Sequence, residues 1–173
     1  MPYYYSPFRK SYAPPSNECP FCDTALMTSQ AIRNSTNTVV ENEHCVWIAN
    51  WFPRCDAHTM LVTKRHITKL EDETSEELVA RHALILTAAT ALQKLYPGSG
   101  LEVFFQTGKN SLSSIPHLHW HIVPAIPEHG LTGFEKIGYF STTKPDEEKV
   151  VMLPITITLA RDELIEKLKH FIP

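Results

Sequence analysis

Residues 117–121, which read His-Leu-His-Trp-His, constrain the fold more than any other part of this chain. In a β-strand every second side chain points to the same face, at a spacing of about 6.6 Å. The alternation therefore predicts a strand over residues 117–124, in which His117, His119 and His121 line one face and the apolar residues between them face a core. Such a strand needs neighbouring strands and a covering layer, so this segment favours a sheet protein.

The rest of the pattern predicts those neighbours and two helices. Short apolar runs indicate strands from residue 39 onward, at 45–49, 59–63 and 101–106, and near 150–159. The clearest helix begins near Thr74, which forms a capping-box pattern with Glu77, and it ends before Pro97. Its apolar stripe is assigned to Leu78, Ile85, Leu86, Ala89, Leu92 and Leu95. With a second amphipathic helix over residues 161–171, the expected class is α+β: a twisted, mainly antiparallel sheet with one long helix and a C-terminal helix.

Size and composition indicate one compact domain. The chain has 173 residues, of which 43% are hydrophobic, enough to bury a substantial core. Residues 1–18 read as an N-terminal arm and residues 19–173 as a single domain. The formal net charge of −3 argues against a protein that binds nucleic acid mainly by bulk electrostatics. A secretory signal and a membrane span of roughly 18 apolar residues are both absent from the pattern, so we expect a cytoplasmic protein.

Three imidazoles on an otherwise apolar strand predict a functional site. Imidazole can act as a nucleophile near neutral pH, as a proton donor when charged, or as a metal ligand. A straight strand holds its outer pair, His117 and His121, about 13 Å apart, which is too far for both to bind one tetrahedral metal ion. One or two of the histidines can therefore serve a metal, and the others remain for chemistry.

The cysteines form a second constellation. Cys19 and Cys22 make a Cys-x-x-Cys pair, which has the spacing of a metal clip or a redox pair. A complete zinc site needs two further ligands, and no second such pair follows. A metal-free thiol pair or a redox pair therefore stays open beside zinc. Cys45 and Cys55 stand alone and are expected to be small buried residues.

Residues 117–123, His-Leu-His-Trp-His-Ile-Val, match the His-φ-His-φ-His-φ-φ signature of the histidine-triad (HIT) nucleotide hydrolases and transferases. Residues 50–53 and 58–66 resemble that family's upstream block, and Gln106 with Gly108 follows the helical interval. The similarity extends over approximately residues 19–124. The resemblance implies the HIT fold and a site for a nucleotide.

The resemblance implies that the middle histidine, His119, attacks the α-phosphorus of a nucleotide ester, anhydride or phosphoramidate. Water or another acceptor then resolves the nucleotidyl-histidine. The attack needs a neutral ring nitrogen aimed at phosphorus, while an acceptor, expected to be a backbone carbonyl, holds the proton of the other nitrogen. His121 would donate to a non-bridging α-phosphate oxygen in the transition state.

Four more residues match positions with roles in that family, and each also has a simpler explanation. Ser114 corresponds to a hydroxyl that reaches the phosphate or the leaving group, or it caps its own loop. Gln106 corresponds to a phosphate-positioning side chain, or it satisfies the sheet edge. His58 corresponds to the histidine beside the active site, or it is a packed loop histidine. Asn50 corresponds to the side chain that binds the ribose hydroxyls, or it is a turn residue.

The chain departs from the family pattern at four positions. Ala57 replaces the usual glycine before the upstream histidine, and Thr63 replaces the usual proline. Ser113 stands where glutamine is common, and Pro116 directly precedes the first histidine of the triad. These differences concern the leaving-group preference rather than the nucleophile.

Zinc-bearing members of the family complete a Cys-x-x-Cys site with the last histidine of the upstream block and the first histidine of the triad. Carried over to this chain, the ligands are Cys19, Cys22, His66 and His117, and the resemblance implies a structural, four-coordinate zinc ion. The first triad histidine would then turn towards zinc while the other two face the substrate.

The leading hypothesis is an enzyme that acts on the α-phosphate of nucleoside phosphoramidates, dinucleoside polyphosphates or adenylyl compounds through an adduct on His119. It would be a hydrolase, a nucleotidyl transferase or a phosphorylase. The alternatives are a nucleotide-binding or sensing protein without turnover, and a metal-binding interaction module. The intact middle histidine favours the enzyme. By analogy we also expect a homodimer with a small nucleotide as substrate, and neither stable nucleic-acid binding nor a membrane.

Overall fold

The computed structural model describes residues 3–4, 19, 21, 37–50, 53, 55–108, 115–126 and 156–172. Within them, five antiparallel strands form one sheet in the order β2-β3-β4-β6-β5. These strands are β2 (Thr38–Glu41), β3 (Cys45–Ala49), β4 (Thr59–Thr63), β5 (Gly100–Phe105) and β6 (His119–Ala125). Two helices, α2 (Ser75–Leu95) and α4 (Arg161–Phe171), pack on it, and a short 3₁₀ turn, η3 (Leu70–Asp72), precedes α2. The α+β class expected from the sequence is confirmed.

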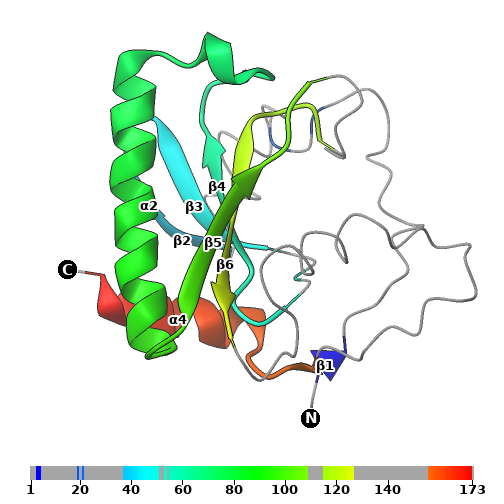
Figure 1. Cartoon of the computed structure of the whole chain (residues 1–173), viewed down its shortest axis with the longest axis vertical. Coiled ribbons are helices and arrows are strands. Elements are labelled where there is room, and N and C mark those ends of the chain that lie inside the picture. Colours follow the sequence, from blue (N-terminus) through cyan, green and yellow to red (C-terminus); the bar gives the residue numbers. More distant parts are fainter. Residues whose placement is uncertain are drawn as a thin grey trace, which may run out of the picture.

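Figure 1 shows how the two helices cover the sheet. The long helix α2 runs along one face, and α4 crosses near the C-terminal end of α2. A separate two-stranded ladder pairs β1 (Tyr3–Tyr4) with β7 (Thr156–Ile157), close to the start of α4. The division of the chain at residue 18 remains a prediction, as does a strand over residues 150–155, which lie outside the described part. None of the described helices has the length and apolar character needed to span a membrane.

The capping box predicted for the long helix is present. The backbone N–H of Glu77 donates to Thr74 Oγ1 at 3.3 Å, and the Thr74 N–H donates to Glu77 Oε2 at 2.9 Å. Each side chain thereby satisfies a backbone N–H that has no partner within the helix. The helix ends at Leu95, and Gly98 at φ +83° turns the chain into β5.

The predicted apolar stripe of α2 was wrong at two leucines. Leu78 and Leu86 are 50% and 57% exposed. The buried apolar residues of the helix are Leu84, Ala88, Ala91 and Leu92. These four follow the i, i+4, i+7, i+8 spacing of a single helical face, and the two alanines let the helix lie close to the sheet. Where a helix packs closely on a sheet, small alanines occupy the contact and some leucines stay on the solvent side, and the leucine pattern does not reveal this.

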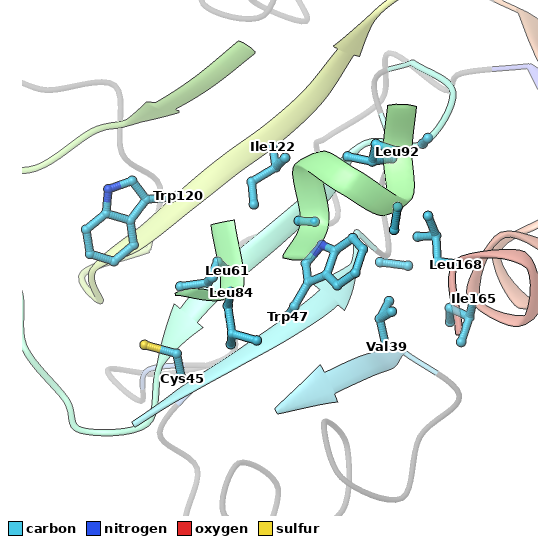
Figure 2. Packing of buried hydrophobic residues seen from close by; sticks show 14 of the residues in the cluster. Val39, Cys45, Trp47, Leu61, Leu84, Leu92, Trp120, Ile122, Ile165 and Leu168 are labelled. Atoms are coloured by element: carbon cyan, nitrogen blue, oxygen red, sulfur yellow. The ribbon is translucent and has the colours of Figure 1, made fainter. Parts of the chain in front are cut away.

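We call the side of the sheet that meets the helices the helix face. Its buried cluster joins Trp47, Leu61 and Ile122 of the sheet to Leu92 of α2 and Leu168 of α4, as Figure 2 shows. The lone cysteines are also buried, Cys45 at 0% and Cys55 at 1% exposure, as predicted. Burial raises the pKa of the Cys45 thiol to about 12, so it stays protonated and unreactive.

We call the opposite side, which carries His119 and His121, the histidine face. A smaller apolar cluster lies there, composed of Phe21, Val46, Ile48, Met60, Val62 and Ile115. Met60 is paired with His121, and Val62 with His119, so these side chains emerge on the same side of the sheet. Alternation along each strand thus supplies one apolar face for the helices and one mixed face for chemistry.

The strand predicted over residues 117–124 was wrong at its start, because β6 begins at His119. The His117 N–H donates to the Ile115 carbonyl at 2.8 Å, and the Leu118 N–H donates to Ile67 O at 2.7 Å. These bonds hold the chain in a bend before the sheet pairing begins. His117 therefore does not share the regular spacing of the other two histidines.

Candidate functional site

His119 is held in one tautomer by the backbone. It lies at the start of β6 and is 5% exposed. Its Nδ1 lies 2.6 Å from the carbonyl oxygen of His117. A carbonyl can only accept, so Nδ1 carries the proton and Nε2 carries the lone pair. This matches the requirement for a nucleophilic imidazole.

His121 lies two residues further along the strand and contacts a second histidine. Its Nδ1 is 2.9 Å from Nε2 of His58, which comes from the segment just before β4. One of these two nitrogens donates in the hydrogen bond and the other accepts. The ring centroids of His119 and His121 are 5.1 Å apart. Two imidazoles from β6 and one from the residue that precedes β4 therefore form one cluster on the histidine face.

The residue predicted to bind ribose lies against this cluster. The Asn50 side-chain nitrogen is 3.2 Å from His58 Nε2 and 3.4 Å from His58 Nδ1. His58 is 1% exposed. Asn50 therefore borders the histidine pair and contacts His58 directly in this structure.

Two further residues, Gln106 and Ser114, were predicted to contact the substrate, and the structure describes the first of them. Gln106 is half-buried and directly follows β5, the strand that pairs with β6. Ser114 lies outside the described residues.

Phe104 of β5 was not predicted, but its ring stacks on the ring of His121, with the two centroids 4.9 Å apart and an interplanar angle of 25°. Strand alternation could have found it, since Phe104 sits directly opposite His121 in the sheet.

His117 turns away from the other two histidines towards Cys19. Its Nδ1 lies 3.6 Å from the Cys19 sulfur. Its Nε2 lies 2.7 Å from the carbonyl oxygen of Thr63 and 3.0 Å from Thr63 Oγ1. The Nε2 proton is therefore held by the Thr63 carbonyl, and Nδ1 presents its lone pair towards the sulfur. Burial lowers the pKa of His117 to about 4, which keeps the ring neutral at pH 7.

Cys19, His66 and His117 together form a cluster that could hold a metal ion. One ligand atom each from Cys19, His66 and His117 lie within 4.8 Å of one another. A thiolate and two imidazoles are zinc-type donors, and a ligating imidazole normally donates its other N–H to a carbonyl or carboxylate, as His117 does to Thr63. The fourth predicted ligand, Cys22, lies outside the described residues. Thr63 stands where the family usually has proline, and in this structure it contacts the ring of His117 beside the cluster.

The loop that carries His66 is tied to the start of α2. Arg65 donates to both carboxylate oxygens of Glu77 at 2.7 Å and to the Asp72 carbonyl at 2.6 Å. This hydrogen bond lowers the pKa of Glu77, which is otherwise raised by burial. The same carboxylate completes the capping box, so one side chain fixes both the helix end and the loop.

Comparisons with known proteins identify the family and the fold. The family model described as "HIT domain" matches residues 32–128, more than half of the chain. An uncharacterized 16.1 kDa HIT-like protein of Mycoplasma pneumoniae is 28% identical over 109 residues, covering 63% of this chain and 72% of the relative. The bis(5'-adenosyl)-triphosphatase of Dictyostelium discoideum is 26% identical over 77 residues, or 44% of this chain and 52% of that enzyme.

A solved structure has the same fold. The zinc-bound histidine triad family protein of Mycobacterium smegmatis aligns with a TM-score of 0.58 and 19% identity, covering 88% of this chain and 91% of the other. At this identity the likeness concerns the fold alone.

Proposed function

Because the chain belongs to the HIT domain family, we propose that it is a nucleotide phosphohydrolase or nucleotidyl transferase that acts through a covalent nucleotidyl-His119 intermediate. The observation that carries the proposal is the 2.6 Å contact between His119 Nδ1 and the carbonyl oxygen of His117. It places the proton on Nδ1 and leaves the Nε2 lone pair for attack. Members of the family include hydrolases of dinucleoside polyphosphates, such as the Dictyostelium relative, which supports this substrate class.

In the proposed first step, His119 Nε2 attacks the α-phosphorus, and the bond from phosphorus to the leaving group breaks. His121 donates to a non-bridging α-phosphate oxygen, and its contact with His58 orients its ring. Asn50 would bind the ribose and Gln106 the phosphate. Ser114 would reach the leaving group. In the second step, water or another acceptor breaks the bond between Nε2 and phosphorus and releases the nucleotide.

Trapping of the adduct tests this mechanism. The protein is mixed with a nucleoside phosphoramidate or a dinucleoside polyphosphate, the reaction is quenched, and the mass of the intact protein is measured by mass spectrometry. We expect a nucleotidyl adduct and turnover in the wild type and neither in His119→Ala, while His82→Ala, an exposed position on α2, behaves as the wild type. Full turnover in His119→Ala would overturn the covalent mechanism. Tight nucleotide binding without turnover in the wild type would instead support the sensing alternative, and adding inorganic phosphate separates phosphorolysis from hydrolysis.

We also propose that Cys19, Cys22, His66 and His117 hold a structural zinc ion. The convergence of three of these residues and the neutral His117 ring support the assignment, and the M. smegmatis protein is a zinc-bound member with the same fold. The ion would link the Cys-x-x-Cys segment to the start of β6 and would take no part in the phosphorus chemistry. Thiolate ligands require reduced cysteines, which agrees with a cytoplasmic location.

Metal analysis tests the zinc site. Purified wild type is expected to contain one zinc ion per chain, and a chelator should lower its melting temperature. Cys19→Ser should lose the zinc and should show no further change with chelator, because its site is already broken. Metal-free wild type with the same stability would contradict the assignment.

A homodimer is the proposed assembly. In support, β5 lies at the edge of the described sheet, and its Val103 and Phe105 are 39% and 38% exposed. Pairing of this edge with a second copy would cover both side chains and would use the outer backbone groups of the strand. Light scattering after size exclusion tests it: the wild type should be dimeric and Phe105→Glu monomeric. A monomeric wild type would contradict the proposal.

A further inference from the structure

The three residues before His58 form a buried turn that depends on a distant part of the chain. Cys55, Asp56 and Ala57 are 1%, 2% and 3% exposed. The His58 N–H closes the turn on the Cys55 carbonyl at 3.3 Å. His58 then enters β4 with its Nε2 2.9 Å from His121. The turn therefore leads directly into the residue whose ring contacts His121.

The turn contains an unfavourable backbone conformation. Ala57 has a φ of 53°, in the left-handed region that residues with a Cβ rarely adopt. Among the described residues, no other non-glycine residue has a positive φ. Such a conformation persists when surrounding contacts hold it in place. The 3.3 Å hydrogen bond that closes the turn is long, and a buried carboxylate in the turn adds shorter ones.

Asp56 provides those contacts from the neighbouring position. Its Oδ1 accepts from the Thr158 N–H at 2.6 Å and from the Leu159 N–H at 3.4 Å, and its Oδ2 accepts from Thr158 Oγ1 at 2.6 Å. These are charge-assisted hydrogen bonds to a nearly inaccessible carboxylate, which makes them strong and directional. They link two segments that are 102 residues apart in sequence.

The anchor lies at a well-defined place in the fold. Thr158 and Leu159 directly precede α4, whose N-cap residue, Ala160, makes no side-chain capping bond. The Asp56 carboxylate therefore also places negative charge near the positive end of that helix. The helix itself is held on the sheet by Leu164, Ile165 and Leu168. The turn is thus attached to a helix that is itself packed on the sheet.

We propose that Asp56 is a positioning residue of the active site, which holds the His58 turn against the segment before α4 and so fixes the geometry of the His58–His121 pair. The inference rests on the proposed function for its effect on turnover. Its effect on the two rings can be measured without any substrate. The C-terminal segment then forms part of the catalytic framework, although it contributes no side chain to the reacting atoms.

The test uses Thr158→Val and Asp56→Asn in the full chain. Thr158→Val removes one of the three hydrogen bonds and leaves the carboxylate, so it is the milder change and the one more certain to fold. Asp162→Asn is the matched control, because it removes an exposed carboxylate from the first turn of α4. The readouts are the imidazole ¹⁵N signals of the histidines and the steady-state kinetics with a nucleoside phosphoramidate.

In both test variants, we expect the ring signals of His58 and His121 to shift or to broaden, while those of the exposed His82 remain unchanged. We expect kcat to fall by about tenfold with KM nearly constant, because small displacements of a catalytic group act on the transition state. Asp162→Asn should match the wild type in both measurements.

Two results are decisive. Unchanged His58 and His121 signals in a folded Thr158→Val or Asp56→Asn variant would overturn the proposal and reduce Asp56 to a structural clamp. A wild type without turnover would refute the proposed function alone, and the ring signals would still decide whether Asp56 positions the histidines.

Discussion

The two faces of the sheet can be compared directly, because the same strands supply both. On the helix face, Trp47 and Leu61 join the helices in a continuous apolar cluster. On the histidine face, a smaller cluster that includes Met60 and Val62 adjoins an imidazole pair and the His119 ring. Strand alternation thus places the main apolar core and the candidate site on opposite sides of one layer. A substitution on either face should therefore affect one property far more than the other.

The largest expected effect is on the helix face. Trp47 is fully buried there, so Trp47→Ala should lower the free energy of unfolding by about 3–5 kcal/mol through lost burial and a cavity. Urea unfolding followed by circular dichroism measures it. Val79→Ala, at a side chain of α2 that is 66% exposed, is the control and should change stability by less than about 0.5 kcal/mol. A loss under about 1 kcal/mol for the tryptophan variant would mean that the cluster is not the main source of stability.

The next effect is on the histidine face. His121→Ala should lower kcat by about 100- to 1,000-fold, since it removes the proposed donor to the transition-state oxygen. Its free energy of unfolding should stay within about 1 kcal/mol of the wild type, because the ring is only partly buried. Steady-state kinetics and urea unfolding on the same preparation provide both values. A stability loss as large as that of Trp47→Ala would break the comparison between the faces.

A smaller effect concerns Glu77, which links the start of α2 to the loop that carries His66. The hydrogen bond from Arg65 holds its pKa below the usual range in the folded state. Its contribution to stability is therefore present above the unfolded pKa of about 4.3 and is lost as the pH falls through the folded value. Glu77→Gln keeps the capping geometry and removes the charge, so we expect a loss of about 1 kcal/mol at pH 7 that disappears in acid.

Urea midpoints at pH 7, 5, 4 and 3 measure this pH dependence. Glu166→Gln, at an exposed position of α4, serves as the control and should differ little from the wild type at any pH. A Glu77→Gln deficit that is the same at all four values would show that the charge of Glu77 has no part in it.

The smallest expected effect is at Ala57. Ala57→Gly removes the Cβ from a left-handed residue but adds freedom to the unfolded chain, so the net stabilisation should be under about 1 kcal/mol. Thermal unfolding measures it. The imidazole signals of His58 and His121 should be unchanged, because the contacts of Asp56 remain. A destabilised variant would mean that the alanine methyl packs better than the backbone strain costs.

Local features were predictable from the sequence, and features that depend on distant contacts were not. The runs at Cys45–Ala49 and Thr59–Thr63 are short and apolar, and both are strands with the expected bounds. The capping box at Thr74 is decided by neighbouring residues and was also predicted. The buried side of α2 was partly missed, because alanines at close helix–sheet contacts look unremarkable in a sequence.

The candidate site divides in the same way. The alternation of histidines predicted the cluster. The bend before β6, however, depends on the hydrogen bond from the Leu118 N–H to the carbonyl oxygen of Ile67, a residue 51 positions earlier in the chain. The family resemblance, not the spacing, indicated that His117 turns towards Cys19. Contacts such as Asp56 with Thr158 join segments whose separate sequences carry no sign of the pairing.

The edge position of β5 has a consequence for handling the protein. The strand Gly100–Phe105 reads Gly-Leu-Glu-Val-Phe-Phe, which contains no proline or lysine to discourage pairing with other chains. Its single charge, Glu102, is followed directly by three apolar residues with strong preference for extended structure. In the proposed dimer this edge is covered, so conditions or variants that favour a monomer would expose it, and we expect them to precipitate sooner on concentration or heating. A lysine in place of Val103 would protect the edge and would make monomeric variants more soluble.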